Sequence, residues 1–129
     1  MPENTPDSEE GSASGEMAHH VDPRSYGDEA PLTYLLGDSS RVKVVGAFVA
    51  ERGRDISISD VARIAGIARS TVYNHIGALE RMGVIEHTRD VRDGHSSLYQ
   101  LNEDSEIADM LYKLEGVTLR KLLDENHFE

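Results

Sequence analysis

Apolar residues recur with a helical period along most of the chain after residue 31. The first amphipathic segment starts at Asp38 or Ser39, either of which can cap a helix, and runs to about Arg52. The residues that share its apolar face are Val42, Val45, Phe48 and Val49. The next apolar run, Ile56-Ser57-Ile58, is too short for more than a small strand. This part of the chain therefore predicts one helix followed by a brief extended segment.

Two shorter helices are predicted next, separated by a glycine. The first has Ser59 or Asp60 as its cap and ends at Gly66. The second spans residues 69–82, and Gly83 stands where a left-handed glycine ends a helix. The inward positions of this second helix are Val72, Ile76 and Leu79.

The hydrophobic period changes after Gly83. VIEHTRDV and SSLYQL are β-prone runs separated by Arg92-Asp93-Gly94-His95, and Asp-Gly between two such runs is a strong hairpin signal. A last long helix is predicted over residues 105–124. The order helix, helix, helix, hairpin, helix predicts a mainly α fold with a small β-hairpin.

Charge divides the chain into acidic ends and a mildly basic middle. The net charge is −11, from 24 acidic and 13 basic residues. Residues 41–101 hold nine basic and seven acidic residues, so this region carries +2. The overall negative charge therefore does not exclude a nucleic-acid partner for the middle of the chain.

Composition narrows the class of protein. Residues 1–30 have few apolar positions and predict a disordered acidic tail. The absence of Cys excludes disulfides and thiolate metal sites. No apolar run approaches membrane-spanning length and the start lacks a secretory pattern, so a cytoplasmic protein is expected. Acid-rich, lysine-poor composition favours a salt-adapted cytoplasm, and an acidic mesophilic protein is the alternative.

Residues 59–82 have the features of a helix-turn-helix. Ala65 is small enough for two helices to pack closely, Gly66 supplies the turn, and Ile67 points back to the core. The outer face of the second helix includes Ser70, Tyr73, Asn74 and Gly77. Asn can read adenine, and hydroxyl groups reach bases or phosphates, so this face suits DNA.

The hairpin completes the pattern with a basic tip that suits a phosphate backbone or a minor groove. The candidate DNA-binding residues of the helix and the hairpin are Arg69, Ser70, Thr71, Tyr73, Asn74, His75, Arg89, Arg92 and His95. Arg81 lies nearer the far end of the helix, where it is expected to meet the DNA backbone or an acidic neighbour.

The stretch GIARSTVYNHIGALERMGVIEHTRDVRDGHSSLYQLN resembles winged helix-turn-helix transcription regulators of the ArsR/MarR type, particularly haloarchaeal members. The resemblance covers residues 36–123. It implies that the helix 69–82 enters the major groove, that residues 86–101 form the wing, and that the C-terminal helix pairs two subunits. Many relatives carry Ser where this chain has Ala68.

These observations divide the chain into an acidic tail (1–30), a winged helix-turn-helix domain (31–104) and a C-terminal dimerisation helix (105–129). A homodimer suits a two-fold DNA site. The residues expected at the dimer interface are Ile107, Met110, Leu111, Leu114, Val117 and Leu122.

The expected function is a sequence-specific, DNA-binding transcription regulator without a cofactor, metal or membrane partner. The alternative is a winged helix that binds protein within a transcription or replication complex, which the mild charge favours. An enzyme is not expected, because no catalytic arrangement is evident. His75, His87 and His95 lie on different elements, which argues against a metal sensor.

Overall fold

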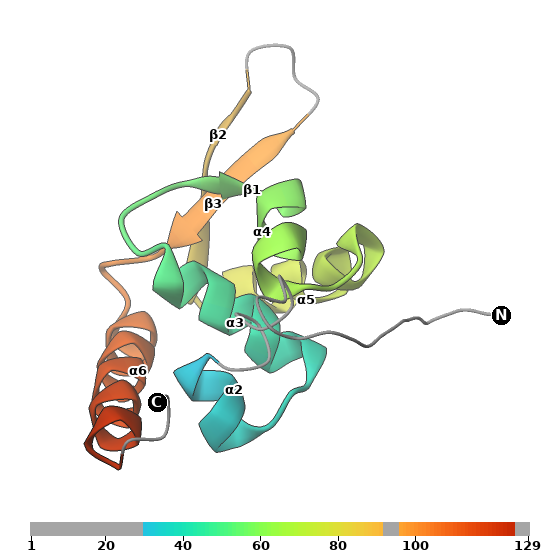
Figure 1. The fold of residues 1–129 in the computed structure, drawn as a ribbon. Coiled ribbons are helices and arrows are strands. Elements are labelled where there is room, and N and C mark those ends of the chain that lie inside the picture. The colour runs from blue at the N-terminus through green and yellow to red at the C-terminus, as the bar shows by residue number, and fades with distance from the viewer. Residues whose placement is uncertain (1–29, 92–95, 126–129) are drawn as a thin grey trace, which may run out of the picture.

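The computed structural model describes residues 30–91 and 96–125 (Figure 1). Its elements are α2 (Pro31–Leu36), α3 (Ser40–Ala50), β1 (Ile56–Ser57), α4 (Ile58–Ala65), α5 (Arg69–Arg81), β2 (Ile85–Asp90), β3 (Ser97–Leu101) and α6 (Glu106–Asp124). The predicted fold class, mainly helical with a small sheet, is confirmed. In the described ranges no helix combines the length and the apolar character that crossing a membrane requires. The predicted disordered tail lies, except for Ala30, outside the described residues.

The helix α3 begins where the sequence predicts. The hydroxyl of Ser39 accepts a hydrogen bond from the backbone N–H of Val42 at 3.2 Å, so Ser39 is the cap. The preceding helix α2 was not predicted from the sequence. Leu32 anchors α2 in the core with no exposed surface.

The helix α4 begins earlier than predicted. Ser57, rather than Ser59 or Asp60, is its cap. The Ser57 hydroxyl accepts a hydrogen bond from the Asp60 N–H, and the Asp60 carboxylate accepts one from the Ser57 N–H, both at 3.1 Å. This reciprocal pair satisfies two backbone donors at once, which a cap at Ser59 would not do. The hydrogen bond from the Ser57 backbone also lowers the pKa of Asp60.

Two glycines end helices in the left-handed conformation. Gly66 follows α4 with φ 75°, and Gly83 follows α5 with φ 76°. A side chain would be strained in this backbone geometry, so glycine is required at both turns. The prediction that Gly66 and Gly83 stop their helices is confirmed.

The hairpin belongs to a three-stranded antiparallel sheet with the order β1-β3-β2. β1 pairs with β3 through Ile56 and Tyr99 and through Ser57 and Leu98. Although β1 has only two residues, this pairing joins the hairpin to the helical part of the domain. The pairing of β2 with β3 is irregular between His87 and Arg89. Because Ser57 ends β1 and caps α4, the sheet leads into the helix-turn-helix without a linker.

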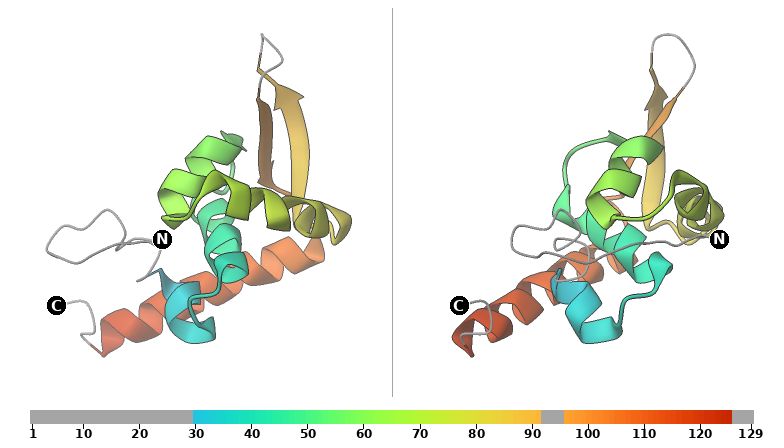
Figure 2. Two further views of the ribbon diagram at one scale, coloured as in Figure 1. Left: turned by 90° about the vertical axis from the view of Figure 1, so that its right-hand side faces the viewer. Right: turned by 45° about the vertical axis from the view of Figure 1, so that its right-hand side comes forward.

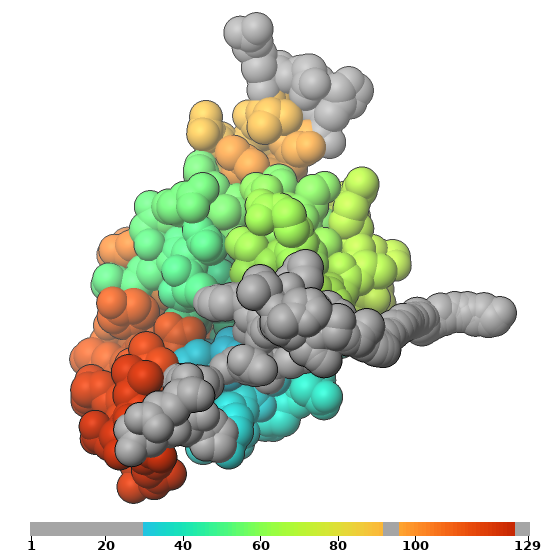
Figure 3. All heavy atoms as spheres, in the orientation of Figure 1, coloured from blue at the N-terminus to red at the C-terminus, as the bar shows by residue number. Residues whose placement is uncertain are grey.

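A small aliphatic core lies between α3, α4, α5 and the base of the sheet. Its largest fully buried side chains are Phe48, Leu32, Ile85, Leu101, Val44, Val49, Val61 and Val72. α6 packs against α2 and α3, and Ala108 is fully buried at the start of α6. The hairpin and α6 therefore extend from opposite ends of the domain (Figures 1 and 2), and the space-filling view in Figure 3 shows the same separation.

Candidate nucleic-acid interface

The outward face of α5 is polar and open. Val72, Ile76 and Leu79 are buried, as predicted from their helical spacing. A helix turns about 100° per residue, so the side opposite these three residues is formed by Ser70, Asn74, Gly77 and Arg81. All four are exposed. The outward face of α5 is therefore polar along its length, and Figure 2 shows that α5 lies beside the base of the hairpin.

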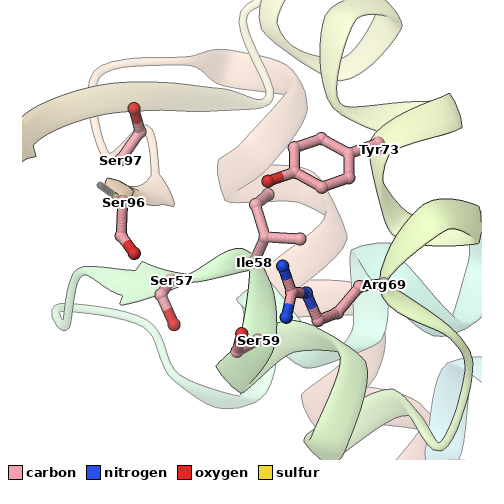
Figure 4. A pocket seen from close by; sticks show the side chains of 7 residues that line it. All are labelled: Ser57, Ile58, Ser59, Arg69, Tyr73, Ser96 and Ser97. Atoms are coloured by element: carbon pink, nitrogen blue, oxygen red, sulfur yellow. The ribbon is translucent and has the colours of Figure 1, made fainter. Parts of the chain in front are cut away.

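A polar cavity lies between the start of α5, the start of α4 and the hairpin. Its lining residues are Ser57, Ile58, Ser59, Arg69, Tyr73, Ser96 and Ser97. The side chains of Arg69 and Tyr73 extend from α5 toward the start of α4, and Ser96 and Ser97 lie on the hairpin side (Figure 4). One guanidinium surrounded by hydroxyl groups can hold an oxyanion such as a phosphate group. Two of the predicted DNA-binding residues, Arg69 and Tyr73, are thus brought together.

The described arginines fall into two groups. The arginines paired with carboxylates are Arg52, Arg54, Arg63 and Arg89. The side chains of Arg69 and Arg81 have neither an ion pair nor a hydrogen bond among the described residues, and both belong to α5. Arg41 has no ion pair within the described ranges and contacts α5 through His75. Three of the four described arginines without an ion pair therefore lie on or beside α5, and the fourth, Arg120, lies on α6.

His75 faces the start of α3 rather than the outward surface of α5. Its ring nitrogen Nε2 lies 2.9 Å from the Ser40 hydroxyl, and Arg41 Nε donates a hydrogen bond to Nδ1 at 3.1 Å. Nδ1 must be unprotonated to accept this bond, so the bonded form of the ring is neutral. Burial and then the nearby Arg41 charge lower the pKa of His75. His75 therefore connects two helices, in contrast to the direct DNA contact predicted for it.

We expect this contact to make stability depend on pH. The folded-state pKa of His75 lies below the unfolded value of 6.5, so the unfolded chain binds more protons near and below that pH. The contribution of His75 is complete above pH 6.5 and is lost as the pH falls below it. Unfolding measured at pH 7.5 and 5.5 should show a smaller loss of stability for His75→Asn than for the original chain. An equal loss in both proteins would contradict this role.

The wing is fastened to the loop before β1. Asp55 Oδ2 accepts a hydrogen bond from the Thr88 hydroxyl and another from Arg89 Nε, both at 3.0 Å. The bond from Arg89 and then that from Thr88 lower the pKa of Asp55. The structure therefore places the predicted DNA-binding residue Arg89 in an ion pair. A second set of contacts joins Asp90 to His87 and Ser97.

Release of Arg89 should strengthen general DNA binding. Asp55→Asn removes one negative charge and weakens the hold on the guanidinium, leaving Arg89 available to a phosphate. We expect affinity for random duplex DNA to rise about twofold to tenfold and the salt dependence to steepen by about one phosphate contact per subunit. Asp109→Asn is the control, because it removes the same charge from a surface ion pair on α6. Equal effects of the two substitutions would attribute the change to net charge alone.

The start of α5 lacks a side-chain cap. Ala68 occupies the cap position, and no side-chain hydrogen bond is made there. Ala68→Ser should supply the missing acceptor and raise the free energy of unfolding by up to about 1 kcal/mol. Thermal unfolding provides the measurement. An unchanged or lower Tm would mean that serine does not cap the helix at this position.

The other residues predicted to bind DNA differ in exposure, and two of them lie outside the described residues. Ser70 and Asn74 are exposed, while Thr71 is half-buried. Arg92 and His95 lie outside the described residues. Within the described ranges, no group of three or more His, Asp or Glu residues is arranged to hold a metal ion.

Residues 47–89 match the family model of the IclR helix-turn-helix domain. These residues run from the end of α3 through α4 and α5 into β2, and the hairpin with its β1 partner supplies the wing. The chain contains a winged helix-turn-helix domain. The predicted resemblance to ArsR/MarR regulators is confirmed only for the winged helix-turn-helix class. The family model that matches the sequence describes an IclR-type domain and not an ArsR or MarR domain. The resemblance to haloarchaeal members stays a prediction.

Solved structures share this fold. The PcaV transcriptional regulator from Streptomyces coelicolor, in complex with its natural ligand, is 26% identical with a TM-score of 0.50; the match covers 65% of this chain and 56% of that one. Streptococcus pneumoniae FabT, in complex with DNA, is 18% identical with a TM-score of 0.54; the match covers 76% and 67%. A point mutant of S. aureus MepR, bound to an oligodeoxyribonucleotide, is 17% identical with a TM-score of 0.54; the match covers 80% and 72%. No curated protein matches the chain by sequence.

Several residues of the interface were not identified from the sequence. Ser59, Ser96 and Ser97 enter the cavity only because the sheet brings β3 beside the start of α4. Arg41 approaches α5 from a segment 34 positions earlier. The hydroxyl-rich composition of these segments was visible in the sequence, but their proximity was not.

Proposed function

We propose that this chain is a DNA-binding transcription regulator that binds duplex DNA as a homodimer. The observation that carries the proposal is the position of the charge: of the four arginines without a carboxylate partner among the described residues, two lie on α5, which has an open polar face, and a third, Arg41, lies beside it. Cations paired with carboxylates have less to gain from phosphate than unpaired ones. The matched helix-turn-helix domain supports the same function.

In the proposed complex, α5 lies in the major groove and the hairpin follows the backbone or the adjacent minor groove. Asn74 is exposed on the outward face and can form paired hydrogen bonds with adenine. Arg69 and Tyr73 lie at the cavity between α5 and the hairpin, where a backbone phosphate fits the donors available. His75 holds α5 against α3 and has a positioning role.

The proposed dimer interface is a stripe on α6 that the domain leaves uncovered. Ile107, Met110, Leu114 and Val117 are 43%, 63%, 37% and 53% exposed. Their spacing of three and four residues places them on one side of the helix, as in paired helices. A second copy of α6 would cover this side.

Two residues predicted at that interface require correction. Leu122 is 5% exposed and therefore buried within its own chain, and Leu111 is partly buried against the core. α6 packs on α2 and α3 through this side, so part of the broad apolar surface is already covered. The α6 stripe is accordingly defined as Ile107, Met110, Leu114 and Val117.

Selection of DNA fragments by the purified protein tests the proposal. Genomic fragments are incubated with the protein over a series of potassium salt concentrations, and the retained DNA is sequenced. A shared two-fold motif supports the regulator. If the retained DNA is random or absent while the protein stays folded, the proposal fails and a protein-binding winged helix becomes the better account.

A further inference from the structure

Gly77 is an unexpected residue in the middle of α5. Glycine destabilises a helix relative to alanine, and Gly77 does not have the positive φ that would require it. A Cβ built on Gly77 would meet only the end of the flexible Arg81 side chain within 4 Å. The packing of the domain therefore does not explain the glycine.

The Arg81 guanidinium lies in the space that Gly77 leaves. Arg81 Nη1 is 3.4 Å from the position that a Cβ on Gly77 would occupy, within the close range of van der Waals contact. Arg81 stands in the last turn of α5, yet its charged end lies beside a residue one turn nearer the start. A basic residue at a helix end can interact with the helix dipole, but that interaction favours a position at the last carbonyl groups.

This arrangement brings the charge of Arg81 toward the middle of the outward face. The guanidinium is exposed and has no carboxylate partner in the described part of the chain. Asn74 precedes Gly77 by three residues on the same side of the helix. A guanidinium and an amide on the same face of a helix can form paired hydrogen bonds with guanine and with adenine, respectively, from within a major groove.

We propose that Arg81 is a specificity-determining residue that reads a guanine in each half of the DNA site, with Gly77 as the gap that admits its guanidinium. The proposal rests on the proposed function and identifies a base that α5 recognises. It differs from the sequence-based expectation, in which Arg81 met the backbone or an acidic neighbour. Lysine has the charge of arginine without its planar pair of donors, so the two residues are not equivalent at a guanine.

The recognition of guanine by Arg81 can be tested by selecting binding sites from a pool of random duplexes. The selection is made with the full chain and, separately, with its Arg81→Lys variant. The original chain should select a two-fold motif with a guanine at one symmetric position. Arg81→Lys should lower the preference for that guanine about tenfold and leave the other positions unchanged. Arg120→Lys is the matched control, because Arg120 also has no partner among the described residues but lies on α6.

The glycine is tested separately by Gly77→Ala. This variant should unfold at a higher temperature and yet lose part of the guanine preference, because the added methyl group would contact the guanidinium at 3.4 Å and restrict the positions open to it. Gly116→Ala serves as its control: it also adds a methyl group to a helical glycine with open space around it, but on α6. It should raise the unfolding temperature without altering the selected motif.

The failing outcomes are distinct. If the original chain selects no shared motif, the proposed function itself fails. An unchanged motif for Arg81→Lys, or an equal loss on all sequences with a smaller salt dependence for Arg81→Ala, would overturn base reading by Arg81. An unchanged guanine preference for Gly77→Ala would overturn the role assigned to the glycine.

Discussion

Replacement of Arg69 and Asn74 together should abolish sequence-specific DNA binding while the fold remains intact. Both side chains are exposed, and neither makes a hydrogen bond with another described residue, so Arg69→Gln with Asn74→Ala removes no internal contact. A good base contact, proposed for Asn74, contributes about 1–3 kcal/mol of discrimination; the phosphate contact proposed for Arg69 adds to the affinity, and each substitution occurs twice in the proposed dimer. We therefore expect affinity for the selected site to fall by at least about a hundredfold.

Binding to the selected duplex, measured together with thermal unfolding, checks this expectation. Arg120→Gln removes an arginine without a described partner from α6 and should leave specific binding nearly unchanged. If the double variant keeps its affinity and sequence preference, α5 is not the reading element. If it unfolds at a much lower temperature, the loss of binding has another cause and single substitutions must be compared.

A charge in the α6 stripe should convert the proposed dimer to a monomer. Met110 and Val117 are more than half exposed, so Met110→Glu with Val117→Glu costs the isolated domain little. In a dimer the same groups would be buried without partners, which is strongly unfavourable. Two linked recognition helices gain about 10²–10⁴ in avidity over one, so DNA affinity should fall by a factor in this range.

Sedimentation of the protein alone gives the direct measurement for this second prediction. Leu123→Glu is the control, since Leu123 is 52% exposed on α6 but lies away from the stripe. It should leave both the dimer and DNA binding unchanged. A double variant that still sediments as a dimer would place the interface elsewhere.

The elements that local sequence determines were predicted well. The cap at Ser39, the start of α5 at Arg69 and the left-handed glycines depend on neighbouring residues, and each is confirmed. The predicted cap of α4 was wrong, because the sequence around Ser57 indicates a strand. Ser57 does lie in β1, but it also caps α4. A residue with two local roles cannot be assigned from propensity alone.

Contacts between segments that are far apart in the sequence could not be predicted. The apolar residues of α6 were identified from the sequence, but the packing of α6 against α2 and α3 leaves Leu122 covered and Met110 exposed. In the same way, Asp55 holds Arg89 and Ser40 contacts His75 across more than 30 positions. The candidate DNA-binding surface could therefore be located from the sequence, while the partners of its charged residues could not.

The double role of Ser57 has a consequence for regulation. One residue ends the strand that pairs with the hairpin and begins the first helix of the helix-turn-helix, so no hinge separates the two parts. The helix-turn-helix and the hairpin are thus joined directly, and the hydrogen bonds of Asp55 with Thr88 and Arg89 hold the hairpin in place further. In the proposed dimer, a signal that controls DNA binding would then act by changing the separation of the two domains. Such a signal would change the distance between the two DNA half-sites that the two subunits can bind together. The bases preferred in each half-site would stay the same.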